Sequence, residues 1–428
     1  HCLKSCLITR NSHSYSKCQS NSQSKAKRGN VKVWAQNSES DIDINPVSNF
    51  FSNVFKPMKT VETAEEQERR LELEKRDQLA AAEVLRQEQV KEDALPYLFL
   101  FALQFLPILG SNRIESIIYF LGVAVTTVYI GGRQETIDEA ERVSEKSALV
   151  APIGASIALG SVYLLIKTGF DPTSLYAVAV TLFGALAISD IGVPILRNIL
   201  PPSFSEKEVQ VPKDIAQKLE LDPPTLPLDG LVTLGLGLLC TAIYWAPVAM
   251  EQKFILSNII AWALAMISLG SISLGSFQTA VILLTGLFCY DIFWVFGTEV
   301  MMTVATKVEA PIKFLYPAPP SEIERAYPFS VLGLGDVVIP GLFVRLMTKV
   351  DQDLKPKVFS YFSAATAAYA LGLSACFVVN EITQAGQPAL LYLNPACIGS
   401  ALVCGVINGQ LDEIINFEEP QIDEEISP

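Results

Sequence analysis

Histidine is nearly absent from this chain of 428 residues, which contains only His1 and His13. Residues 14–428 therefore cannot form a Ser-His dyad or triad, or an HExxH zinc site. They also lack the side chain whose charge ordinarily changes near neutral pH. Any chemistry in this part of the chain must use carboxylates, lysine, tyrosine or hydroxyl groups.

Paired cysteines are lacking as well. Three of the eight cysteines lie in the first 38 residues, and the other five are scattered through apolar runs with no CxxC pair. Lone cysteines in apolar runs are usually small buried hydrophobic residues. The sequence therefore predicts neither a metal site nor a disulfide framework.

Acidic residues are missing from residues 1–38, which hold seven basic residues, many serines and no apolar signal core. This composition is typical of an organellar transit peptide and favours import into a plastid, although a disordered basic tail would look similar. The remainder carries 25 basic against 45 acidic residues. Such an acidic body argues against nucleic acid as a partner, because phosphates need a basic surface.

Long apolar runs dominate the rest of the chain, where charge is sparse. Half of all residues are hydrophobic, 18% are charged, and the mean hydropathy is +0.34. Runs of about 18 or more such residues predict membrane-spanning helices. Nine are found, at 115–132, 148–166, 174–196, 228–247, 254–274, 278–298, 328–347, 358–379 and 388–407. The predicted fold class is an all-α polytopic membrane protein, with membrane lipid around it.

Four segments follow from this pattern. They are the leader at 1–38, a charged and partly helical segment at 39–93, a membrane-embedded domain at 94–407 and an acidic tail at 408–428. A shorter apolar run at 94–110 could span the membrane or lie at its interface. The tail from Gln410 onward is expected to be disordered, because it is acidic.

Basic residues near the ends of the runs predict the orientation. Counted from the run at 115–132, one side receives eleven flanking lysines and arginines and the opposite side six. The first side is therefore expected to face the cytoplasm or, in a plastid, the stroma. The run at 278–298 leaves that side and the run at 328–347 returns to it.

Two aspartates lie inside apolar runs. Asp291 is the only charge between Ala280 and Gly297, and Asp336 is the only one between Phe329 and Val344. A carboxylate at such depth costs about 2.5–3.5 kcal/mol, so it rarely occurs without a function. If both runs are helical throughout, Asp291 lies about 16 Å from one face and Asp336 about 14 Å from the other. Both would then lie near one level of the membrane.

A facing pair of carboxylates can share one proton, so that one group acts as base and the other as acid. Such a pair can activate water for attack on an amide carbonyl. Gly333 and Gly335 precede Asp336, and their missing side chains would let a substrate backbone come close. The spacing alone leaves a channel or transporter open, since intramembrane aspartates also form ion or proton paths.

Four segments resemble the GxGD intramembrane aspartyl proteases, and the signal peptide peptidase family more closely than presenilin. They are "YDIFWVFGTEVMMTVA" (290–305), "EAPIK" (309–313), "LGLGDVVIPG" (332–341) and "QPALLYLNPACIG" (387–399). The nine predicted runs and their orientation agree with that family. The leader, the charged segment and the extra run at 94–110 depart from it.

The resemblance implies an intramembrane aspartic endopeptidase that needs neither metal nor organic cofactor. It implies that Asp291 and Asp336 are the catalytic pair, that Pro388, Ala389 and Leu390 shape the active site, and that Tyr290 and Gly335 belong to the motifs. We further predict that Tyr290 positions Asp291.

Transmembrane peptides, such as signal-peptide remnants and type II-oriented segments, are the substrates that the resemblance implies. An inactive binder of membrane helices is a further alternative, which the intact motifs disfavour. The family is typical of the endoplasmic reticulum, which stands as the alternative to a plastid membrane. The sequence leaves a homo-oligomer open.

Overall fold

The computed structural model describes most of the chain after residue 90. The described residues are 84, 88, 90–110, 112–134, 141–170, 173–201, 204, 207–211, 225–246, 248–318, 327–383 and 385–419. The chain divides into one unit of residues 10–81 and another of residues 1–9 with 82–428, and every described residue belongs to the second. The predicted leader and nearly all of the segment 39–93 therefore lie outside the described residues.

The described residues are mainly α-helical. Seven helices are long and apolar enough to cross a membrane. They are α6 (Arg113–Arg133), α7 (Glu145–Lys167), α8 (Thr173–Ile199), α12 (Met250–Ser271), α13 (Phe277–Phe296), α16 (Tyr361–Thr383) and α17 (Leu390–Asn408). This confirms the prediction of an all-α polytopic membrane protein.

Two further helices occupy predicted runs without being counted as spans. The apolar helix α11 (Leu228–Tyr244) has only 17 residues, and α15 (Gly335–Leu354) carries several charged side chains, among them Asp336, Arg345 and Lys349. All nine predicted runs therefore contain a helix, whereas a total of nine spans stays a prediction.

The run at 328–347 differs from the prediction of one continuous helix. Its first part is β6 (Phe329–Gly333), which pairs antiparallel with β5 (Lys313–Pro317), and α15 begins only at Gly335. A strand rises about 3.3 Å per residue and a helix 1.5 Å, so the depth estimated for Asp336 from a helical rise is wrong. These apolar residues form a strand and not a helix because β5 is available as a partner strand, which the run itself does not reveal.

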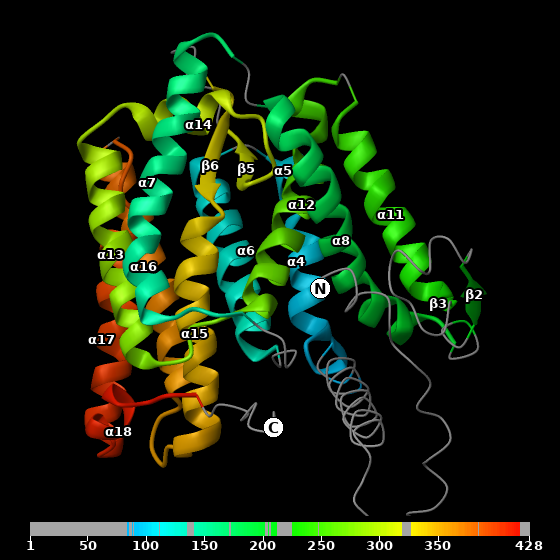
Figure 1. The fold of residues 1–428 in the computed structure, drawn as a ribbon. Helices are drawn as coiled ribbons and strands as arrows, with labels where there is room; N and C mark the ends of the chain where they lie inside the picture. The colour runs from blue at the N-terminus through cyan, green and yellow to red at the C-terminus, as the bar shows by residue number, and fades with distance from the viewer. Residues whose placement is uncertain are drawn as a thin grey trace, which may run out of the picture. The chain divides into compact units, whose positions relative to one another are not determined.

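The helices form two packed groups joined by α12 (Figure 1). In one, α13, α15, α16 and α17 pack together, and α6 packs on α15 and α16. In the other, α8 packs along α11, while α12 contacts both α8 and α15. The main apolar core lies in the first group and includes the fully buried side chains of Phe343, Tyr361 and Tyr369.

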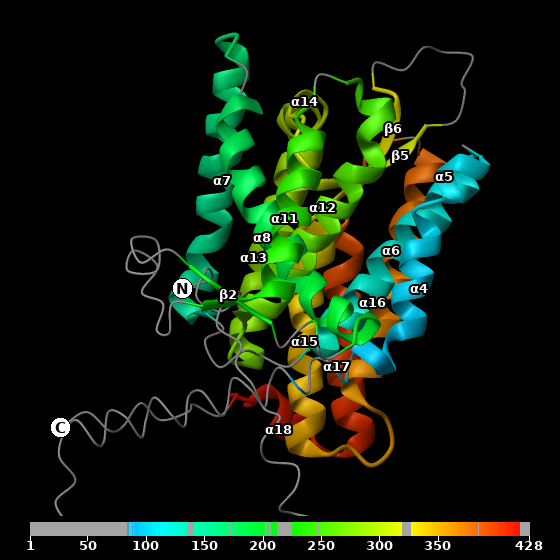
Figure 2. The ribbon, with the colours of Figure 1, turned by 90° about the vertical axis from the view of Figure 1, so that its right-hand side faces the viewer.

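Helix α7 is the most exposed of the seven, and it stands at the edge of the group in Figure 2. It packs on α13 and on the short helix α14 (Val300–Lys307). Its Ser156 hydroxyl accepts a hydrogen bond from the Trp294 ring nitrogen at 3.1 Å. Helix α7 thus covers one side of α13, and most of its other side chains are free to face lipid.

The apolar run at 94–110 folds as two short helices, α4 (Ala94–Leu103) and α5 (Leu106–Leu109), of which α5 has proline near its start. A turn at Gln104 and Phe105 interrupts the helix between them, and α4 packs on α6. Ten residues of α4 rise about 15 Å, half the thickness of a hydrocarbon core. Neither helix in this run is long enough to span.

The acidic tail is partly ordered, contrary to the prediction. Residues Leu411–Ile415 form α18, and the segment after it runs back across the start of α13. The Phe277 amide donates to the Phe417 carbonyl at 3.0 Å, and Glu419 accepts from the Ser273 hydroxyl at 2.6 Å. Packing of Ile414 and Phe417 into the core explains the order, because each buries an apolar side chain.

Three short two-stranded sheets complete the described fold. Besides β5 and β6, β1 (Glu141–Arg142) pairs in parallel with β4 (Ile272–Ser273), and β2 (Glu208–Gln210) pairs antiparallel with β3 (Thr225–Pro227). Of the three, only the sheet of β5 and β6 leads directly into a helix that carries one of the predicted site residues.

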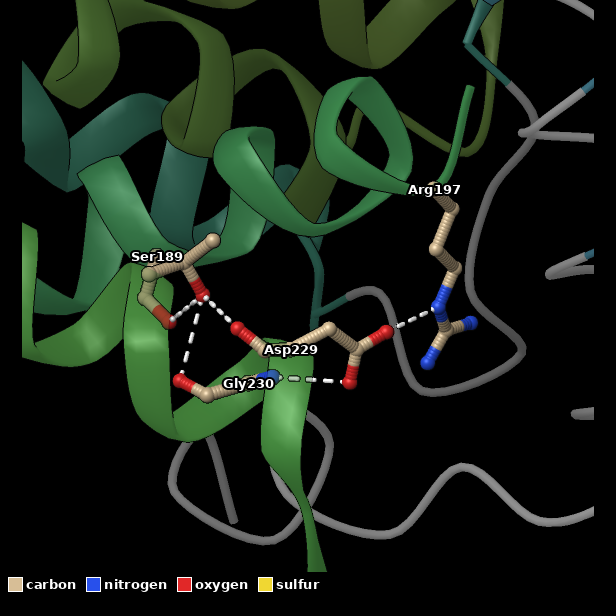
Figure 3. Close-up of polar contacts among 5 residues, drawn as sticks. Ser189, Arg197, Asp229 and Gly230 are labelled. Atoms are coloured by element: carbon tan, nitrogen blue, oxygen red, sulfur yellow. Dashed lines mark hydrogen bonds and ion pairs between the residues drawn. The ribbon is translucent and has the colours of Figure 1, made fainter. Parts of the chain in front are cut away.

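A buried ion pair joins α8 and α11. Figure 3 shows Arg197 reaching the carboxylate of Asp229, which is fully buried. The other Asp229 oxygen accepts from the Gly230 amide at 2.8 Å, and the hydroxyls of Ser189 and Thr233 are 3.0 Å apart beside it. A buried charge of this kind is stable because it is paired and hydrogen-bonded. Asp229 therefore has a structural role between these two helices.

Candidate active site

Asp291 lies on α13, in the half of the helix nearer its C-terminus. The helix begins at Phe277, where Ser276 accepts a hydrogen bond from the Thr279 amide at 3.1 Å, a standard N-cap contact. Every residue from Phe277 to Phe296 other than Asp291 is uncharged. The Asp291 side chain is only 4% exposed, so this apolar helix places one carboxyl group inside the protein.

Asp336 enters the site from the first turn of α15. Strand β6 ends at Gly333, and only Leu334 separates it from the helix that begins at Gly335. A Cβ atom at Gly333 would lie 3.2 Å from Asp336 Oδ2, tighter than most such contacts. At Gly335 the nearest atom would be Ile339 Cδ1 at 3.8 Å, an ordinary contact. Gly333 is therefore the glycine that directly makes room for the carboxylate.

The third part of the site is the start of α17. Pro388, Ala389 and Leu390 are all buried, and the helix begins with Leu390. The Leu390 amide donates a hydrogen bond to Asp291 Oδ2 at 3.0 Å. Amides in the first turn of a helix have no partner within the helix, and the dipole there favours negative charge. Because the helix begins just after Pro388, the free Leu390 amide can donate a hydrogen bond to Asp291.

Asp291 and Asp336 lie close enough for their charges to interact. Among the described residues, neither carboxylate has an ion pair with a lysine or arginine. The positive ends of two helix dipoles lie nearby instead. Asp336 lies in the first turn of α15, and Asp291 accepts a hydrogen bond from the start of α17. This differs from Asp229, whose charge is balanced by Arg197. Two neighbouring carboxyl groups without a counter-ion can share a proton.

Tyr290, which was predicted to position Asp291, precedes it on α13. Its ring packs at a tilt on Trp294, with ring centroids 6.4 Å apart. Neighbouring residues on a helix point about 100° apart, so Tyr290 and Asp291 do not face the same way. In the part of the chain that the structure describes, no hydrogen bond joins the Tyr290 hydroxyl to Asp291. Positioning of Asp291 by Tyr290 stays a prediction.

Two residues near the site were not among the predicted ones. The Tyr369 hydroxyl on α16 donates to the Asp336 carbonyl oxygen at 3.3 Å, and Asn394 Nδ2 on α17 donates to the Leu284 carbonyl oxygen at 2.5 Å. Each ties a helix of the site to a neighbour. Asn394 follows Leu390 by one helical turn within a matching segment, which was a usable signal. Tyr369 stands alone in an apolar run, where no pattern marks it.

The sheet beside Asp336 has an ordered register. The pairs 314/332 and 316/330 exchange hydrogen bonds, and the same alternation continues in the Leu334 amide to Ile312 carbonyl bond of 3.1 Å. Val331 and Gly333 therefore direct their main-chain groups away from β5. Within the described residues these groups have no hydrogen-bond partner. The outer edge of β6 is a free strand edge that ends beside Asp336.

No cluster of three or more histidine, cysteine, aspartate or glutamate side chains within the described ranges could hold a metal ion. The described site therefore offers two carboxyl groups, a helix N-terminal amide and a free strand edge.

Comparison with known proteins assigns the chain to a family. Residues 135–421 match the family model described as signal peptide peptidase. Human signal peptide peptidase is 34% identical over 316 residues, which are 72% of this chain and 83% of that protein. A probable intramembrane protease of Schizosaccharomyces pombe is 30% identical over 312 residues, or 70% and 94% of the two chains. Intramembrane protease 2 of Caenorhabditis elegans is 38% identical over 186 residues, 40% of this chain and 39% of that one.

These relatives are peptidases by name, and none of the three is called a channel or a transporter. With seven helices that can cross a membrane, the chain is an integral multi-pass membrane protein. The match covers the segments that carry Asp291, Asp336 and Pro388. The chain belongs to the signal peptide peptidase family of intramembrane aspartic proteases.

Proposed function

We propose that Asp291 and Asp336 together hydrolyse peptide bonds of membrane-spanning segments. The observation that carries this is that two carboxyl groups, from α13 and α15, lie close enough for their charges to interact, without a cation in contact among the described residues, while the Leu390 amide donates to one of them, Asp291. In this pair one carboxyl is protonated and the other ionised, because two adjacent charges without a counter-ion repel.

The pair can carry out both halves of the reaction. The ionised carboxyl takes a proton from water while the water oxygen bonds to the carbonyl carbon, and the protonated carboxyl donates its proton to the carbonyl oxygen. The resulting diol then breaks its C–N bond as a proton passes to the leaving nitrogen. The products are a carboxyl and an amine end, and the two aspartates again hold one proton between them.

The α17 amide favours Asp291 as the group that is ionised first. It already donates to Asp291 Oδ2, and a hydrogen bond to the charged form stabilises that form. Asp336 would then hold the proton. The roles exchange during the reaction, so the pair acts as one unit.

The free edge of β6 gives the substrate an extended conformation beside the pair. In an α-helix each carbonyl is hydrogen-bonded four residues on and shielded by side chains, so a helical segment must unwind before attack. Unwinding in lipid exposes polar main-chain groups at a cost of several kcal/mol each. We propose that these groups pair with Val331 and Gly333 as an added strand, which delivers the peptide bond to Asp336.

The substrates proposed are signal-peptide remnants and other segments whose N-terminus faces the cytoplasm-like side. Human signal peptide peptidase is named for the first class, and the predicted orientation of α13 and α15 matches the second. A homo-oligomer remains compatible with the fold described. For location, we propose a plastid membrane from the acid-free leader, with the endoplasmic reticulum as the alternative.

Replacing either aspartate should abolish cleavage. We expect Asp291→Asn and Asp336→Asn each to lower the rate by at least about a thousandfold, and the double variant to be no worse, because the two groups act as a unit. A purified reporter peptide of one spanning segment measures this. The control is Asp229→Asn, a buried acid outside the site, which should keep cleavage per folded molecule. Full activity in either catalytic variant would refute the assignment.

A methyl group at Gly333 should impair the site more than one at Gly335. Gly333→Ala forces the Asp336 carboxylate aside by a few tenths of an ångström. Displacing a reacting group by 1 Å costs about 100-fold, so we expect a loss of about tenfold. Gly335→Ala meets only ordinary contact and is the matched control. Rates are to be normalised to the fraction that binds a transition-state analogue, and an equal loss in both variants contradicts the role given to Gly333.

Helix-breaking residues and orientation should decide which segments are cut. Reporters with Gly, Ser or Pro in the half of the segment near the aspartates should be cleaved faster than an all-Leu segment of equal length, because they unwind at lower cost. Reversing insertion with flanking charges should slow cleavage of the same segment. Mass spectrometry of the products in reconstituted vesicles measures both. Equal rates within each pair would mean that neither unwinding nor orientation limits the reaction.

The leader should direct the protein to a plastid. Residues 1–60 fused to a fluorescent reporter are expected to colocalise with a plastid marker, with a scrambled sequence of the same composition as control. Uniform cytosolic fluorescence of the fusion, or a reticular pattern of the full-length protein, would instead favour the endoplasmic reticulum.

A further inference from the structure

The outer edge of β5 is closed by a side chain of α12. Asn258 is 1% exposed, and its amide forms two hydrogen bonds with the main chain of Leu315. Nδ2 donates to the Leu315 carbonyl oxygen at 2.8 Å, and Oδ1 accepts from the Leu315 amide at 2.8 Å. One donor and one acceptor on one residue are the same pair of contacts that a neighbouring strand makes in an antiparallel ladder. Asn258 therefore occupies the place of a third strand.

The other outward positions of β5 are closed too. Pro317 has no amide hydrogen, and proline is typical of strand edges that accept no partner. At the other end, Lys313 is buried, and its ammonium donates to the carbonyl oxygens of Ala305 and Val308 near the end of α14. The sheet thus has one closed edge and one free edge.

The Asn258 amide is held in one orientation. Nδ2 also donates to the Tyr119 hydroxyl at 2.7 Å, and this hydroxyl donates to Gln104 Oε1 at 3.2 Å. Turning the amide over would place its oxygen against the Leu315 carbonyl oxygen. The segment between α4 and α5, which carries Gln104, is thereby linked through α6 and α12 to the sheet.

This contact also determines which main-chain groups of β5 face β6. If β5 moved by one residue along β6, it would have to turn over, and Leu315 would direct its main-chain groups toward β6 and lose both bonds to Asn258. The pairs 314/332 and 316/330, which hold β6 with Val331 and Gly333 on its free side, would be lost as well. An extended peptide on that edge would then lie in a less fixed position relative to Asp336.

We propose that Asn258 is a positioning residue that closes the β5 edge of the sheet and holds β5 in the pairing that supports β6, whose free edge meets the substrate beside Asp336. The inference rests on the proposed addition of substrate to β6. Asn258 touches no reacting atom, and its effect is on which peptide bond is presented.

The test compares Asn258→Ala with Tyr119→Phe. The first leaves the Leu315 main-chain groups without their partner on α12, while the second removes only the hydroxyl that orients the amide. One reporter segment is digested by purified protein in vesicles, and the cleaved bonds are mapped by mass spectrometry. Active molecules are counted by titration with a transition-state analogue, so that loss of folded protein does not affect the result.

For Asn258→Ala we expect the share of the main cleavage site to fall at least about twofold and KM to rise about three- to tenfold, the effect of one or two lost hydrogen bonds. Tyr119→Phe should keep the wild-type cleavage site. A merely structural role of Asn258 would reduce the active fraction and leave both the site and KM unchanged, which would overturn the inference.

Asn258→Asp provides a second test, because the aspartate side chain has nearly the same shape as asparagine. An ionised carboxyl presents only acceptors and repels the Leu315 carbonyl oxygen, whereas a protonated one again presents a donor and an acceptor. The share of the main site should therefore be low at alkaline pH and recover on acidification, a ratio that does not depend on the rate. A share that is independent of pH and equal to wild type overturns the inference.

Val331→Pro separates this inference from the proposed function. Proline removes the outward N–H group of residue 331 and leaves the hydrogen bonds to β5 intact. Val331→Ile keeps this N–H group and is the matched control. A loss of about three- to tenfold in kcat/KM is expected for proline alone. If Val331→Pro cleaves like wild type, strand addition fails and the role of Asn258 fails with it. If Val331→Pro is impaired but Asn258→Ala behaves like wild type, only the inference about Asn258 fails.

Discussion

The structure depends on keeping negative charge inside a membrane protein without a positive side chain beside it. Asp291 and Asp336 have no lysine or arginine in contact among the described residues, and main-chain dipoles take that place. The Leu390 amide at the start of α17 and the first turn of α15 both point positive ends toward the pair. A permanent cation would hold both carboxyls ionised, and neither could then donate a proton. Partial charges of helix ends permit both protonation states.

This arrangement requires helices that end or begin at the depth of the site. Only Leu334 separates β6, which ends at Gly333, from α15, which begins at Gly335, and Pro388 precedes α17. Interrupted main chain in a membrane is tolerated where it is buried in protein or lines a polar cavity. The helix starts of α15 and α17 both lie beside the aspartates. They therefore provide the Leu390 amide as a hydrogen-bond donor and leave the edge of β6 free for a peptide.

Much of the fold could be predicted because apolar run length is a strong signal, and each of the nine runs contains a helix. Of the predicted site residues, Asp291 lies close enough to Asp336 for their charges to interact, and it accepts a hydrogen bond from the Leu390 amide. The hairpin of β5 and β6 was missed, since residues 329–333 are as apolar as a helix would be and only the partner strand decides between the two. The role of Leu390 is a main-chain role, which a residue pattern cannot reveal. Asn258 was missed because a single asparagine in an apolar run has no distinctive spacing.

The ordered end of the chain has a mechanical consequence. The Phe417 carbonyl holds the first amide of α13, while Glu419 contacts Ser273 and lies 3.9 Å from the Lys349 ammonium on α15. The segment of residues 417–419 therefore contacts both α13 and α15, at the ends of these helices that are far from the aspartates. Cutting the chain before Phe417 would remove this link at one end of α13 and α15 and leave only their direct packing there, such as Phe277 on Phe343. A change at the end of the chain could thus alter the spacing of the carboxyl groups without contacting them.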